Sequence, residues 1–195
     1  MNAEEFWRWF ASEQADLRGA GGQLVADRVE ASLRQFDPRI GIEVGDPGAD
    51  RELIFTAWSQ PEVFPAVRAL MDAAPRSPAG WKLIALKPPR GFEFAIDVDG
   101  LQVDASKLWF DALGSPEAPG ALGLRVYVGV GAPGSDPRWV RALALIIETG
   151  IGEEASAQID YIEPYGGPPA DERSMKIEQL LSFVRWHHRE RGVKS

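Results

Sequence analysis

The stretch FEFAIDVDGLQV, residues 92–103, predicts an antiparallel β-hairpin and indicates the class of fold. The dipeptide Asp99-Gly100 is typical of a two-residue type I′ turn. A turn at this point pairs Val98 with Leu101, which are both apolar, and places them on one face. The further pairs are Ile96 with Val103 on that face, and Asp97 with Gln102 and Ala95 with Asp104 on the other. Turn chemistry and apolar pattern therefore predict the same register.

The sequence on either side of this hairpin predicts further hairpins and helices. Helices are expected to begin at Asn2, near residue 25, at Ser59, at residue 138 and at Ser174, with a short helical piece at 106–113. Strands are expected over residues 40–44, 52–58, 81–87, 92–98, 101–103, 124–130 and 157–163. Hairpins outnumber βαβ units in this order. We therefore predict an α+β fold, in which helices pack on a mainly antiparallel or mixed β-sheet, with an N-terminal helical pair and a C-terminal helix.

Residue types at the helix ends give more specific expectations. Asn2 is followed three residues later by Glu5, which predicts a capping box, and Ser59 stands in the same relation to Glu62. Asp136 and a following proline predict the start of the next helix. Gly150 is expected to end that helix.

The helix over residues 138–149 is apolar on most sides, so it is predicted to be the most buried one. The side chains expected to be inaccessible are Ala142, Leu143, Leu145, Ile146 and Ile147. In the first helix the aromatic residues are expected in the core, and Trp7, which falls outside the main apolar stripe, is the one that could be exposed.

Composition places the chain among ordinary globular proteins. It has 195 residues, 45% of them hydrophobic, and we expect one domain over residues 1–195. A net charge of -8 without a basic stripe argues against nucleic acid and against an anionic membrane surface, and suits a protein partner with a basic surface. Cysteine is absent, which excludes disulfides and thiolate ligands.

The beginning of the sequence is acidic and lacks the apolar run of a signal peptide. The longest apolar stretch is also far shorter than the roughly 18 residues of a membrane span. These features predict a cytoplasmic protein. The abundance of Ala, Gly, Pro and Arg is typical of G+C-rich codons and suggests a bacterial source.

Three motifs have ordinary explanations. The run GVGAPG, residues 129–134, matches G-x-G-x-x-G, but its last two residues fall where a nucleotide-binding helix should already run, so no cofactor is expected. Asp97, Asp99 and Asp104 lack the further ligands of a calcium loop, and a turn and a cap account for them, so no metal is expected. His187 and His188 point about 100° apart on a helix and cannot chelate one ion together.

Four residues are the candidate binding residues. Trp81, Lys87 and Arg90 combine an aromatic ring with two cations, which suits an anionic ligand. Glu153 follows the most buried helix, where a partly desolvated carboxylate is a candidate base or anchor. The alternative function is therefore a small-ligand-binding protein or an enzyme with a cleft near these residues.

The leading function is a non-catalytic binding or protein-interaction domain of a regulatory or immunity type. The sequence holds no evident nucleophile–base set, metal cluster or phosphate loop. This absence favours a protein partner over a substrate.

A series of short segments resembles a widespread, uncharacterised bacterial family of unknown function. The segments are Phe6-Trp7-Arg8-Trp9-Phe10, residues 52–57 (ELIFTA), Phe64-Pro65-Ala66-Val67, Ala74-Pro75, Gly80-Trp81, residues 85–89 (ALKPP) and Gly152-Glu153. The resemblance spans most of the chain. It implies a bacterial, cytoplasmic, single-domain protein, and it implies no activity and no catalytic residue.

Overall fold

The computed structural model describes residues 1–48, 50–76, 78–114, 117–118, 120–129, 136–169 and 173–192. The chain has the predicted α+β fold, with an N-terminal helical pair and a C-terminal helix. Its internal contacts group into two compact units, which we name the N-terminal unit, Met1–Lys87, and the C-terminal unit, Pro88–Ser195. The single domain expected over residues 1–195 stays a prediction.

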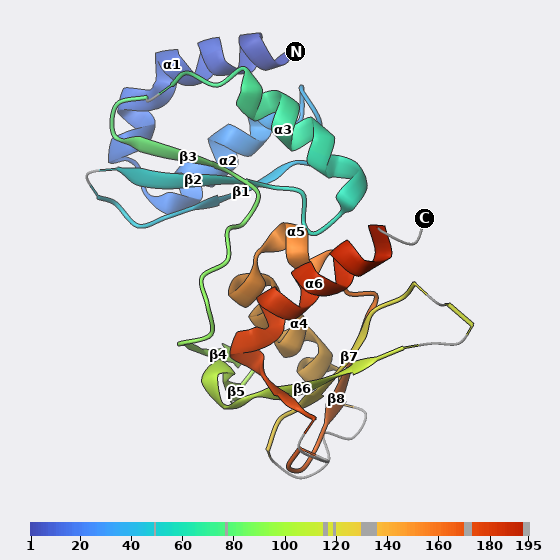
Figure 1. Cartoon of the computed structure of the whole chain (residues 1–195). Coiled ribbons are helices and arrows are strands. Elements are labelled where there is room, and N and C mark those ends of the chain that lie inside the picture. The colour runs from blue at the N-terminus through green and yellow to red at the C-terminus, as the bar shows by residue number, and fades with distance from the viewer. Residues whose placement is uncertain are drawn as a thin grey trace. The chain divides into compact units, whose positions relative to one another are not determined.

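The N-terminal unit packs its helices on one face of a small mixed sheet (Figure 1). Its elements are α1 (Ala3–Gly19), α2 (Gly22–Leu33), β1 (Gly41–Val44), β2 (Arg51–Thr56), the 3-10 turn Pro61–Val63, α3 (Phe64–Asp72) and β3 (Trp81–Ala85). The strand order is β1-β2-β3. β1 and β2 form an antiparallel hairpin, whereas β3 runs parallel to β2 after the crossover through α3.

The capping box that begins α1 is confirmed, because the Asn2 side chain accepts from the Glu5 N–H and the Glu5 side chain accepts from the Asn2 N–H. Trp7, the aromatic residue outside the main stripe, is not exposed but belongs to the core. Its ring is buried edge-on against Phe55 of β2, and its Nε1 donates to the Leu70 carbonyl of α3 at 2.6 Å. α1 is therefore covered by both the sheet and α3, which widens its buried stripe beyond the main apolar residues.

The capping role predicted for Ser59 is also wrong. An N-cap residue has an extended backbone, whereas Ser59 has a φ of 57° and its neighbour Trp58 a φ of 54°. Both lie in the left-handed region, so they form a turn. The 3-10 turn then begins at Pro61, and α3 begins at Phe64.

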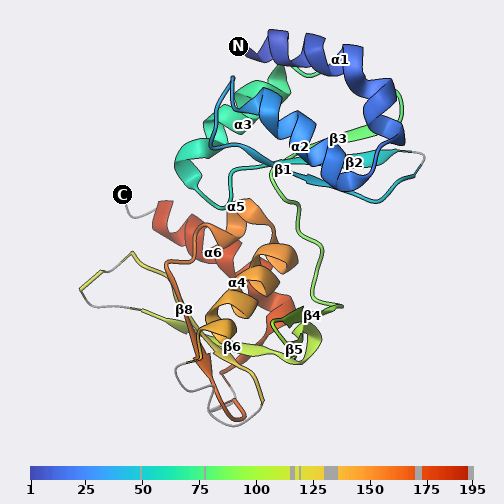
Figure 2. The ribbon, with the colours of Figure 1, turned by 180° about the vertical axis from the view of Figure 1, so that it is seen from behind.

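The C-terminal unit has its own sheet, with α4 and α6 packed on one face (Figure 2). Its elements are β4 (Ala95–Val98), β5 (Leu101–Asp104), the 3-10 turn Ala105–Lys107, β6 (Trp109–Leu113), β7 (Gly123–Tyr127), α4 (Pro137–Ile151), α5 (Glu153–Ser156), β8 (Tyr161–Tyr165), β9 (Met175–Lys176), the 3-10 turn Ile177–Gln179 and α6 (Leu180–Gly192). The strand order is β8-β7-β6-β9, and only β7 and β8 are parallel. β8 is an edge strand and contains Pro164.

The β4–β5 hairpin has the predicted register, with Val98 opposite Leu101 and Ala95 opposite Asp104. The short helical piece expected at 106–113 is mostly wrong. Only Ala105–Lys107 is helical, and the chain then continues as β6. The 3-10 turn ends because Leu108 returns to the extended backbone that β6 requires.

α4 begins as predicted, with the Asp136 side chain accepting from the Arg138 N–H at 3.0 Å. Four of the five side chains expected to be inaccessible are fully buried or nearly so, but Leu145 is 45% exposed. One side of α4 therefore faces solvent, although it is apolar there. Gly150 does not end the helix: it lies inside α4 against the Phe92 ring, and Gly152, with a φ of 83°, is the residue that ends it.

Candidate functional site

Trp81 and Lys87 lie in the N-terminal unit and have structural partners there. Trp81 is buried against Phe10 of α1, and its Nε1 donates to the Gln14 carbonyl at 3.3 Å. The Lys87 ammonium lies 2.7 Å from a carboxylate oxygen of Glu43 and 4.9 Å from the ring centre of Trp58. A groove of about 770 Å³ beside the α3–β3 connection is lined by Trp81 but by none of the other three candidates.

Arg90 and Glu153 lie in the C-terminal unit, at the C-terminal end of α4. The Arg90 N–H donates to the Thr149 carbonyl at 3.0 Å, and Glu153 is the first residue of α5. The Glu153 side chain is fully buried, whereas Arg90 is exposed. A cleft near these four residues, with at least two of their side chains converging in it, stays a prediction.

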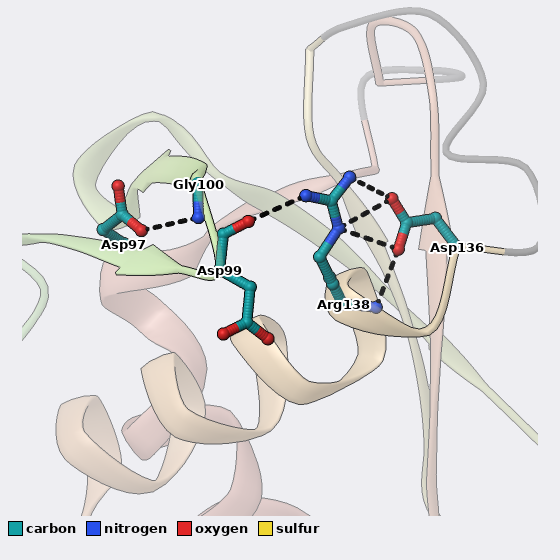
Figure 3. A network of polar contacts seen from close by, with 5 residues as sticks. All are labelled: Asp97, Asp99, Gly100, Asp136 and Arg138. Atoms are coloured by element: carbon teal, nitrogen blue, oxygen red, sulfur yellow. Dashed lines mark hydrogen bonds and ion pairs between the residues drawn. The ribbon is translucent and has the colours of Figure 1, made fainter.

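The three aspartates near the hairpin turn each hold protein groups, and Figure 3 shows two of them, Asp97 and Asp99. Asp97 accepts from the Gly100 N–H at 2.8 Å, which fixes the turn. Asp99 binds the N-terminal part of α4, because its carbonyl accepts from Arg138 at 2.9 Å, as Figure 3 shows. Its carboxylate accepts from Arg141 at 2.6 Å. The hairpin is thereby tied to α4. Asp104 caps the following 3-10 turn through Ser106. In the described residues no cluster of three or more acidic or histidine side chains could hold a metal ion.

Two other motifs, the glycine-rich run 129–134 and the histidine pair, do not add to a candidate site. In the run 129–134, all residues after Gly129 lie outside the described residues. His187 stacks on Phe183, with ring centres 6.0 Å apart, on the same helix as an exposed Trp186.

A set of side chains that sequence reasoning did not single out lies on the face of the four-stranded sheet opposite the helices. We name it the outer face. Alternation along the strands defines it, because Phe110, Leu124 and Val126 point into the core and their neighbours point the other way. Its members are Trp109, Asp111, Leu113, Gly123, Arg125, Tyr127, Tyr161, Glu163, Tyr165 and Lys176.

The strand register orders part of this face into an aromatic row across all four strands. Tyr165 of β8, Tyr127 of β7, Trp109 of β6 and Lys176 of β9 stand side by side. The rings of Tyr165 and Tyr127 pack edge-to-face at 5.4 Å, and the Lys176 ammonium lies 5.9 Å from the ring centre of Trp109. Tyr165 is 44% exposed and Trp109 is partly exposed, whereas Tyr127 is buried, so the row is open only at these two rings.

A charged row runs beside it and contains Glu163, Arg125 and Asp111. Arg125 donates from Nε and from a terminal nitrogen to one oxygen of Glu163, Oε2, at 3.1 and 3.0 Å, and this hydrogen bonding raises the pKa of Arg125 above its usual value. Its guanidinium also lies 5.2 Å from the ring centre of Tyr165. Asp111 accepts a hydrogen bond from the Tyr127 hydroxyl. The two rows are therefore joined by direct contacts.

The last row contains Tyr161, Gly123 and Leu113. A Cβ atom on Gly123 would lie 1.9 Å from Cζ of Tyr161, so the tyrosine ring lies directly over the glycine backbone. Tyr161 is 41% exposed, and within the described parts of the chain no cation lies over its ring. The side of the ring away from Gly123 is therefore the open one.

Sequence reasoning missed this site for two reasons. β6 was expected to be helical, so Trp109 and Asp111 had no sheet to belong to. Strand order across four segments is also a long-range property, and the sequence does not state which strands are neighbours. The available signal was the alternation in β7, where Arg125 stands between two core residues.

No family model, no curated protein and no solved structure matches the chain. In the part of the chain that the structure describes, no helix has the length and apolar character needed to cross a membrane.

Proposed function

We propose that the chain is a non-catalytic, cytoplasmic protein-interaction domain of a regulatory or immunity type, and that it binds its partner through the outer face. The observation that carries the proposal is the aromatic row with Arg125 beside it. Tyrosine, tryptophan and arginine are the residues that most often dominate the free energy of protein–protein binding. In the described part of the C-terminal unit they stand together on the sheet face opposite α4 and α6.

The charge of the chain supports a basic partner. A net charge of -8 attracts a protein with a positive surface and speeds their encounter at low salt. The same charge opposes binding to nucleic acid or to an anionic membrane, and the proposal includes neither. We further propose that the chain belongs to the bacterial family that its segments resemble.

The test is affinity capture from the native host with matched variants. Tyr165→Ala removes an outer-face ring that is 44% exposed, and Leu145→Ala removes a comparably exposed apolar side chain from α4. A stoichiometric protein should be captured by the wild type and by Leu145→Ala. Its affinity for Tyr165→Ala should be at least about tenfold weaker, which corresponds to about 1.4 kcal/mol.

Two results would contradict the proposal. One is repeated capture without any stoichiometric protein partner. The other is a partner that binds the Tyr165→Ala and Leu145→Ala variants equally well, because that partner uses another surface.

A further inference from the structure

We infer that Tyr161 and Glu163 form a subsite for an arginine side chain of the partner. The inference rests on the proposed function, because it names the chemistry that one part of the outer face recognises. Tyr161 and Glu163 are two residues apart on β8, so their side chains leave the same face of the strand about 6.6 Å apart.

The first argument is the position of the Tyr161 ring. It lies over Gly123, where no side chain separates it from the backbone. This contact occupies one side of the ring, and the side chain remains 41% exposed. The face of an aromatic ring carries negative electrostatic potential and attracts a guanidinium placed within about 6 Å of its centre.

The second argument is a comparison within the outer face. The two other partly exposed rings each have a cation of the same chain beside them: Arg125 lies 5.2 Å from the centre of Tyr165, and Lys176 lies 5.9 Å from the centre of Trp109. Tyr161 is the ring to which the described residues supply no cation. A ligand that brings its own cation completes the same arrangement.

The third argument is that one carboxylate oxygen of Glu163 can accept a further hydrogen bond. Nε and one terminal nitrogen of Arg125 both donate to Oε2. Within the described residues the side chain of Glu163 makes no further hydrogen bond. The side chain is 45% exposed, and Oε1 is the oxygen that Arg125 does not bind. A guanidinium stacked on Tyr161 can donate to this oxygen, because its planar nitrogens extend beyond the ring.

The geometry favours arginine over a neutral ligand. Citrulline has the same shape as arginine, with a urea in place of the guanidinium, so it retains the stacking surface but has no charge. Both the ring face and the carboxylate discriminate between these two groups by charge.

The experiment is an NMR titration of the full chain, labelled with ¹⁵N, at low ionic strength. The probes are Nα-acetyl-arginine amide and, as the neutral control, Nα-acetyl-citrulline amide. Arginine should cause saturable shifts at the amides of Gly123, Tyr161 and Glu163, with a dissociation constant on the order of tens of millimolar. Citrulline should bind at least about fivefold more weakly.

Variants locate the effect. Tyr161→Leu covers Gly123 without an aromatic face and should abolish the arginine response, whereas Tyr161→Phe keeps the ring and should preserve it. Glu163→Gln should remove most of the preference for arginine over citrulline. The inference is overturned by equal shifts with both probes, by an unchanged response in Tyr161→Leu, or by no response to arginine.

The arginine titration and the capture experiment can succeed or fail independently of one another. A partner that is lost on Tyr165→Ala supports the outer face as the binding surface even when arginine does not bind at Tyr161. Conversely, arginine binding at Tyr161 stands as a result when no stoichiometric partner is captured.

Discussion

Truncation of Ile146 tests the packing that holds the outer face in place. Ile146 is fully buried in α4, within the cluster that includes Phe110 and Leu124 of the sheet. Ile146→Ala removes three carbons, each worth about 0.8 kcal/mol of transfer free energy, together about 2.4 kcal/mol. The cavity left behind adds to this loss. We expect the free energy of unfolding to fall by about 3–4 kcal/mol.

The adjacent residue provides a matched control. Leu145→Ala removes the same number of carbons from the same helix, but the side chain is 45% exposed, so we expect a loss of about 1 kcal/mol or less. The measurement is native-state hydrogen exchange read from peptides of α4 and β7, so that the N-terminal unit does not enter the readout. Equal losses for the two variants, or a loss below about 1 kcal/mol for Ile146→Ala, would refute the packing argument.

Three further predictions concern the turn regions and the outer face. Gly123→Ala should displace the movable Tyr161 ring, lowering the free energy of unfolding by less than about 1 kcal/mol but removing the arginine response in the NMR titration. The hydrogen bonds from Ser106 hold the pKa of Asp104 below its usual value, so Asp104 stabilises the fold above about pH 4, and this contribution disappears as the pH falls through the lowered pKa. In Ser106→Ala, a carboxyl-carbon NMR titration should show that pKa rising towards its usual value, and an unchanged pKa would contradict this assignment. Adding NAD, NADP, FAD or ATP should leave the melting temperature unchanged, because no nucleotide is expected to bind the run 129–134. A ligand at about 100 times its dissociation constant would add about 2.7 kcal/mol, so a clear rise with any of the four would contradict this expectation.

Local chemistry was predicted well from the sequence where a few neighbouring residues decide the structure. The Asp99-Gly100 turn determines the hairpin register, and Asn2 and Asp136 begin their helices, because each involves groups within about five residues of one another. The fold class followed from the order of these elements.

Tertiary contacts account for the expectations that the structure corrects. Trp7 is buried because α3 covers a second side of α1, and the contacts that enclose it, Phe55 and Leu70, are distant in sequence. Leu145 shows the opposite case, an apolar side chain that the described residues leave 45% exposed. The outer face likewise depends on strand order. Its residues come from four strands that are separate in the sequence, so the sequence alone does not show that they lie together.

Both borders of the four-stranded sheet are built to resist aggregation. An unpaired strand offers its backbone groups to a strand of another molecule, which is the first step towards fibrils. Pro164 leaves β8 without one backbone donor, and at the opposite border β9 has only two residues, Met175–Lys176, the second of them charged. In the described residues, the four-stranded sheet therefore has no long regular edge on which a second copy can continue it. The aromatic side chains of the outer face are therefore carried by a sheet whose borders offer few backbone groups for pairing with another copy.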